Sequence, residues 1–87
     1  MYQVEFAADV ITDLTHFTED EQDDILIVAM RLGEEPRPPG VIIEPLVESA
    51  DGRVYVIDLD FCRLFYAIYE TAQVVRVMAL MRRFSLN

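Results

Sequence analysis

The stretch FCRLFYAIYETAQVVRVMALMRR, residues 61–83, decides the fold of this chain. Two apolar runs flank the polar sequence Glu70–Gln73, a pattern typical of two β-strands joined by a turn. Arg63 lies near the start of the first run, and Arg82 and Arg83 end the second. Strand side chains alternate between the two faces of a sheet, so residues at such positions can converge on one surface. Because arginine can donate two parallel hydrogen bonds to a phosphate, this hairpin is also the candidate binding surface.

The length of the final turn decides whether Arg63 and Arg83 lie on the same face of the sheet. A connection of three or five residues places them together, whereas a connection of two or four residues separates them. The sequence alone leaves both arrangements open. A further arginine, Arg76, lies within the last strand, which is expected at 74–82.

Two more strands are expected upstream, at 41–48 and 53–59. Pro45 predicts that the first of them is an edge strand or contains a bulge, because proline has no N–H to donate to a neighbour. The sequence Asp51-Gly52 marks the turn between the two strands. Both alternating faces of 53–59 are largely apolar, so we expect one face to cover helices and the other to remain available to a partner.

The N-terminal half predicts a short strand at 2–6 and two helices, at 7–16 and 19–32, that form an antiparallel hairpin. The segment 34–40 contains three prolines and a glycine and is expected to be a linker, too short to separate domains. The element order therefore predicts one α+β domain over residues 1–87, with the helices on one face of a mainly antiparallel four-strand meander.

The second helix has clear sequence signals at both ends. Thr18 and Glu21 have the spacing of a capping box, and Gly33 is expected to end the helix. The acidic run at 19–24 is better explained by this cap and a solvated face than by a metal site. His16, the single histidine, is expected to be a polar residue between the two helices.

The composition predicts a cytoplasmic protein with unburied apolar surface. A chain of 87 residues that is 53% hydrophobic has too little interior for all its apolar side chains, so we expect a partner or a second copy to cover some of them. Cys62 is the only cysteine and is expected to be buried without a disulfide. The sequence begins without the basic and apolar regions of a signal peptide, and no apolar run is long enough for a membrane span.

Charge is distributed unevenly along the chain, whose net charge is −9 and which contains no lysine. Residues 1–51 contain thirteen Asp and Glu but two Arg, whereas residues 52–87 contain three Asp and Glu and five Arg. Because cations dominate the affinity for nucleic acids, only the second half could approach one. No glycine-rich phosphate loop and no cluster with metal-ligand spacing occurs, so we expect neither a cofactor nor a metal.

The whole pattern resembles the RelE/ParE superfamily of toxins from type II toxin–antitoxin systems. The resemblance lies in four segments that follow one another along the chain: YQVEFAADVITDL, RLGEEPRPPG, VYVIDLDFCRLFYAIYE and VVRVMALMRR. It implies a helical hairpin packed on a twisted sheet, and a cognate antitoxin that neutralises the protein. Members of the RelE branch cut mRNA on the ribosome without a metal, and members of the ParE branch inhibit DNA gyrase.

The resemblance transfers to this sequence only in part. The arginines of the RelE site fall on Arg63 and Arg83, with Arg82 as an adjacent basic residue. Two lysines of that site should fall on Val56 and Asp58, and neither position is basic. The tyrosine expected beyond the last arginine has no counterpart before the chain stops, nor does the C-terminal helix of many relatives. Losing the two lysines and gaining the Asp58 carboxylate near a phosphodiester would remove several kcal/mol of transition-state stabilisation, since one such donor is worth roughly 3–4 kcal/mol.

The leading hypothesis is a toxin-like protein that binds its target, either the ribosome with its mRNA or DNA gyrase, and is neutralised by an antitoxin. The candidate target-binding residues are Arg63, Arg76, Arg82 and Arg83. An alternative is an mRNA endoribonuclease that uses Arg63, Arg83 and Asp58, with Asp58 as the general base. A third reading is an inactive toxin fold that persists as a homo-oligomer through its apolar sheet face. Whether the protein is an enzyme is left open.

Overall fold

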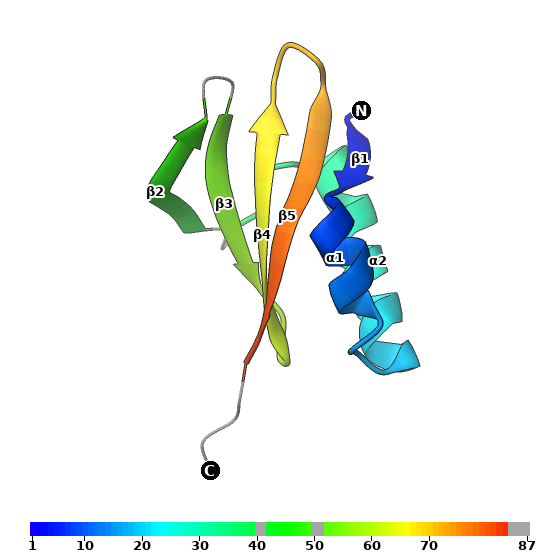
Figure 1. Cartoon of the computed structure of the whole chain (residues 1–87). Helices are drawn as coiled ribbons and strands as arrows, with labels where there is room; N and C mark the ends of the chain where they lie inside the picture. Colours follow the sequence, from blue (N-terminus) through cyan, green and yellow to red (C-terminus); the bar gives the residue numbers. More distant parts are fainter. Residues whose placement is uncertain (40–41, 50–51, 84–87) are drawn as a thin grey trace.

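The elements follow one another in the order β1–α1–α2–β2–β3–β4–β5 (Figure 1). A computed structural model describes residues 1–39, 42–49 and 52–83. The bounds of the elements are β1 Gln3–Phe6, α1 Ala8–Leu14, α2 Glu19–Glu34, β2 Ile42–Ser49, β3 Gly52–Asp58, β4 Cys62–Tyr69 and β5 Val74–Arg82. The predicted turn at Asp51-Gly52 lies partly outside the described residues, while the predicted turn at Glu70–Gln73 is confirmed.

The five strands form one sheet in the order β1-β5-β4-β3-β2. Strands β2 to β5 are an antiparallel meander, and β1 joins its β5 edge in parallel orientation. Helices α1 and α2 lie on the same side of the sheet, α1 against β5 and α2 against β1 and β5 (Figure 1). The predicted α+β fold is confirmed. So is the edge position of the Pro45 strand, since β2 ends the sheet and its register shifts between Glu44 and Glu48.

The core lies between the helices and one face of β3, β4 and β5. Alternate residues of β4 point into it, and Cys62, Leu64 and Tyr66 are fully buried there. Helix α2 contributes Ile25, Ala29 and Leu32, and α1 contributes Val10. The predicted burial of Cys62 is confirmed, and removal of the thiol from water raises its pKa to about 11.

The predicted capping box at the start of α2 is confirmed. The backbone N–H of Glu21 donates to the Thr18 hydroxyl at 3.2 Å, and the Thr18 N–H donates to the Glu21 carboxylate at 2.9 Å. The expectation that Gly33 ends the helix is wrong, because α2 continues through Gly33 to Glu34. Gly33 instead allows β1 to approach closely, since a Cβ at this position would lie 2.8 Å from Val4 Cγ2 and 2.9 Å from the Tyr2 carbonyl oxygen.

The segment that follows α2 is held against one end of the sheet. Tyr66, whose ring stacks on Tyr55, donates its hydroxyl to the Pro36 carbonyl oxygen at 2.7 Å. The Arg37 guanidinium donates to the Tyr55 hydroxyl at 3.2 Å and forms an ion pair with Glu70. These contacts connect the linker to β3 and to the β4–β5 turn, so Arg37 has a structural role. No helix in the described part of the chain is long and apolar enough to cross a membrane.

Candidate functional site

A β-bulge in the closing hairpin decides where the arginines point. The turn between β4 and β5 has four residues, a length that by itself would place Arg63 and Arg83 on opposite faces. However, Tyr66 pairs with Val77 whereas Phe65 pairs with Ala79, so Met78 is an extra residue on β5. One extra residue reverses the alternation of everything beyond it. Arg63 therefore pairs with Met81, and the two side chains share a face of the sheet. Arg83 is two residues beyond Met81, directly after β5, so it lies on this same face.

This shared face is the one that the helices do not cover, and Asp58 joins the two arginines there. Asp58 lies directly opposite Arg63 in the register of β3 and β4. Arg63 donates two hydrogen bonds to the Asp58 carboxylate, from Nε to Oδ1 at 2.8 Å and from Nη2 to Oδ2 at 3.3 Å. Arg83 Nη1 lies 3.7 Å from Asp58 Oδ2 and donates to the Leu59 carbonyl oxygen at 3.2 Å. These three side chains, Asp58, Arg63 and Arg83, are called the Asp58 cluster below.

The Asp58 cluster is open to solvent and carries one net positive charge. The side chains of Arg63, Asp58 and Arg83 are 38%, 29% and 47% exposed. The hydrogen bonds from Arg63, together with the positive charges of Arg63 and Arg83, hold the pKa of Asp58 below its usual value. Asp58 is therefore ionised at neutral pH and takes up part of the donor capacity of both arginines. A phosphate or carboxylate bound here would have to compete with it.

Arg82 lies on the other face, because it pairs with the buried Cys62. Its guanidinium carbon lies 4.4 Å from the centre of the Phe17 ring. It donates to the His16 carbonyl oxygen at 3.1 Å and to the Glu21 carboxylate at 3.3 Å. The hydrogen bond from Arg82 is the main reason why the pKa of Glu21 is lowered. Arg82 thus holds the end of β5 to the corner between α1 and α2.

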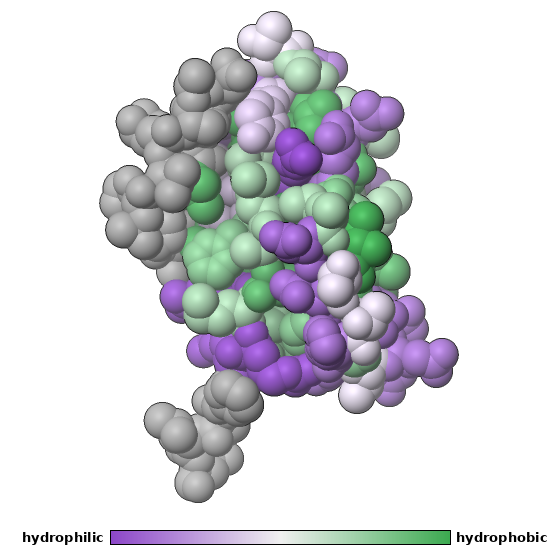
Figure 2. Space-filling model, in the orientation of Figure 1, coloured by the Kyte–Doolittle hydropathy of each residue, from purple (hydrophilic) through white to green (hydrophobic). Residues whose placement is uncertain are grey.

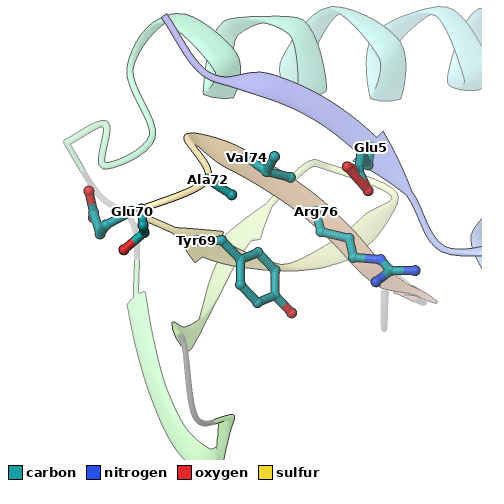
Figure 3. Close-up of a pocket in the computed structure, with 7 residues that line it drawn as sticks. Glu5, Tyr69, Glu70, Ala72, Val74 and Arg76 are labelled. Atoms are coloured by element: carbon teal, nitrogen blue, oxygen red, sulfur yellow. The ribbon is translucent and has the colours of Figure 1, made fainter.

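Arg76 is on the same face as the Asp58 cluster but further along the sheet. It pairs with Ala67, four residues from Arg63 along β4, which corresponds to roughly 13 Å. Arg76 and its β1 neighbour Glu5 line an open cavity of about 710 Å³, together with Tyr69 and Glu70 (Figure 3). Among the described residues Arg76 has no ion-pair partner. The cavity presents charges of both signs rather than a basic pocket.

The surface around these sites combines apolar and polar regions. Figure 2 shows hydrophilic side chains gathered at the lower end of the molecule, where the β3–β4 turn and the end of β5 lie, with apolar side chains above them. Several large apolar side chains are exposed, which agrees with the predicted leftover apolar surface: Ile11, Leu26, Ile27, Met30, Met78 and Met81. Within the described part of the chain, no group of three or more His, Cys, Asp or Glu side chains could hold a metal ion.

Comparison with solved structures shows which fold this is. A chain of the archaeal RelE–RelB complex from Pyrococcus horikoshii superposes with a TM-score of 0.83 at 23% identity, over 98% of both chains. The chain has the RelE fold. The isolated RelE toxin of E. coli gives a TM-score of 0.77 at 18% identity, over 100% of this chain and 89% of that one. A toxin–antitoxin complex from Mycobacterium tuberculosis gives 0.75 at 22% identity, over 94% and 98%. No protein-family model and no curated protein sequence matches the chain.

Within this RelE fold, the two positions where the resemblance predicts lysines both lie on β3, on the face of the Asp58 cluster. Val56 pairs with Phe65 and is 1% exposed, and Asp58 pairs with Arg63. The place of one cation is therefore taken by a buried valine and that of the other by a carboxylate. The sequence supplied no signal for the Met78 bulge or for Glu21 as the partner of Arg82, because both depend on pairing between distant segments.

Proposed function

We propose that this chain is the toxin-like component of a type II toxin–antitoxin module and is neutralised by a cognate antitoxin. The observation that carries the proposal is the likeness in fold over nearly the whole length of RelE chains, two of which were solved in toxin–antitoxin complexes. The unevenly distributed charge and the exposed apolar side chains support it, because an antitoxin would cover such surface.

We further propose that the protein acts by binding its target through Arg63 and Arg83, with Arg76 as a more distant contact, while Arg82 supports the end of β5. The convergence of Arg63 and Arg83 on one open face supports this role, because two guanidinium groups can contact one anionic group. Asp58 would then adjust the affinity by competing for the same donors. The target itself, ribosome-bound mRNA or DNA gyrase, is the part that experiment must identify.

The second candidate function, RNA cleavage, is favoured by the same convergence, since Asp58 lies between two arginines that could stabilise a charged phosphorane. Its chemistry is weak on two counts. A carboxylate whose pKa is lowered is a poor general base near neutral pH. The arginines are also partly neutralised by Asp58 before any phosphate arrives. We therefore place binding ahead of cleavage.

Growth arrest on expression tests the proposal. The wild-type protein should arrest growth, co-expression of the antitoxin should relieve the arrest, and the double substitution Arg63→Ala with Arg83→Ala should abolish it. Arg31→Ala on α2, an exposed arginine remote from this face, is the matched control and should remain toxic. Circular dichroism of each variant separates lost binding from lost folding. A double variant as toxic as the wild type would remove the arginines from the site.

Incubation of the purified protein with mRNA, with and without ribosomes, distinguishes binding from cleavage. Binding without cut products is expected. Specific cleavage that Asp58→Asn abolishes would instead establish the endoribonuclease. A wild-type protein that is harmless to its host and forms oligomers by light scattering would support the third reading, an inactive toxin fold.

A further inference from the structure

The outer face of α2 carries an ordered line of side chains that the core does not use. Asp23, Ile27, Met30 and Glu34 follow at intervals of four, three and four residues, which places them on one side of the helix. The opposite side of α2, centred on Ile25, packs into the core. The line therefore faces away from the sheet, with two carboxylates at its ends and two apolar side chains between them.

The apolar centre of this line is exposed to solvent. Ile27 is 50% exposed and Met30 is 66% exposed, and the neighbouring Leu26 is 41% exposed. Together with Arg31 and Glu34 these side chains line a shallow hollow of about 400 Å³. Leu26, Ile27 and Met30 are called the α2 patch below. Adjacent exposed apolar side chains of this size are typical of a surface that another protein covers.

The charges around the α2 patch indicate what kind of partner fits it. Asp20, Asp23 and Asp24 precede the patch by up to two turns, and Glu34 and Glu35 follow it. Arg31 also lines the hollow, and these six charges sum to −4, so the surroundings of the patch remain acidic. A second copy of this chain would bring carboxylates against carboxylates whether its α2 ran parallel or antiparallel, which is unfavourable. An occupant with cations at both ends of an apolar stripe would meet opposite charge at each end. The distance between Asp23 and Glu34 along the helix is about 16 Å.

We propose that the α2 patch docks a basic amphipathic helix of another protein. Its apolar side chains would pack on Ile27 and Met30, and Lys or Arg residues about 11 positions apart would face Asp23 and Glu34. This binding site uses the helix layer and not the sheet face that carries the Asp58 cluster. It rests on the proposed function in one respect, because an antitoxin is one protein that could supply such a helix. The two proposals fail separately: a chain that is harmless to cells but binds the helix would contradict the toxin role and leave the α2 site standing.

Synthetic peptides of about 18 residues test the proposal, because this length is sufficient for a helix to form on contact. The first peptide has a leucine stripe with two lysines at each end, the second has the same stripe with glutamates at the ends, and the third has the lysines with serines in place of the stripe. Fluorescence anisotropy measures the affinity of each labelled peptide for the intact protein. Only the first peptide should bind, and its affinity should fall as salt is raised because the end charges become screened.

Variants of the protein locate the site. Ile27→Glu and Met30→Glu should each weaken binding of the first peptide by roughly tenfold or more, since each places a charge within the apolar contact. Met78→Glu is the matched control: it changes an exposed methionine on β5 and should leave the affinity unchanged. Because Ile27 and Met30 are exposed, these substitutions should not unfold the protein, and thermal unfolding checks this.

Three results would overturn the proposal. Equal binding of the peptide with glutamate ends would show that charge does not select the partner. Equal loss of affinity in Met78→Glu would show that the peptide binds elsewhere. A dimer of the protein alone that Ile27→Glu dissociates would show that the patch is covered by a second copy.

Discussion

Replacement of Asp58 by asparagine should strengthen the attraction of this protein for polyanions while slightly lowering its stability. Asparagine has nearly the same shape, so the substitution removes one negative charge from between Arg63 and Arg83 and changes little else. The net charge of the Asp58 cluster rises from one to two positive charges. The asparagine amide competes less strongly than a carboxylate for the donors of both arginines, so a phosphate oxygen displaces it more easily.

The cost in stability can be worked out from the geometry. At 2.8 Å and 3.7 Å, the separations of Arg63 and Arg83 from Asp58, a pair of unit charges interacts by about 1–6 kcal/mol for effective dielectric constants between water and a protein surface. The side chains are about a third or more exposed, so the measurable loss should be near the lower limit, about 1 kcal/mol. A loss of this size in a domain of 87 residues lowers the melting temperature by about 4–8 °C.

The gain in binding follows from counterion release. One additional phosphate contact on a single strand makes the slope of log K against log salt concentration steeper by about 0.7, which corresponds to about fivefold tighter binding at 0.1 M salt. Fluorescence anisotropy with a labelled oligoribonucleotide over a salt series measures both quantities. Asp60→Asn is the matched control, because it makes the same charge change in the β3–β4 turn at an exposed carboxylate.

Two outcomes would refute this reasoning. An equal change of slope in Asp60→Asn would show that net charge, and not the Asp58 cluster, governs binding. A weaker affinity of Asp58→Asn for RNA in a folded protein would show that the carboxylate supports binding, as expected if it orients the arginines or acts as a base.

Three further predictions concern the fold. Gly33→Ala should lower the free energy of unfolding by about 1–3 kcal/mol in spite of alanine's better helix propensity, because its Cβ would lie 2.9 Å from the Tyr2 carbonyl oxygen. Denaturant titration measures this, and a variant more stable than the wild type would contradict the prediction. Cys62 should resist thiol reagents at pH 8 in the folded protein, since its pKa is raised to about 11, and rapid labelling would contradict its burial. The free energy of unfolding should be constant near neutral pH and fall as the pH drops below about 4.5. Three carboxyl groups have lowered pKa values in the folded state, so the unfolded chain binds their protons first on acidification and becomes favoured. Urea titrations from pH 7 to 3 measure this, and a rise in stability on acidification would contradict it. These groups are Glu21, Asp58 and Glu70.

Much of the fold followed from local patterns. Alternation of apolar residues located the strands, and the Thr18–Glu21 spacing located the start of α2, because both signals act over a few residues. Gly33 shows where such reasoning fails. A glycine near the end of a helix is commonly a stop signal, yet here it is buried inside α2 because β1 passes too close for a Cβ.

For the candidate site, the sequence by itself determined which residues are available: arginines at 63, 82 and 83, a carboxylate at 58, and no lysine anywhere. Only the tertiary structure decided their arrangement. The four-residue turn alone would have placed Arg63 and Arg83 on opposite faces of the sheet. The bulge at Met78 places them on the same face, and Arg82 on the other face hydrogen-bonds to Glu21. The physical reason is that a strand has a period of two residues. One unpaired residue, set by long-range pairing and not by local preference, reverses the face of every side chain beyond it.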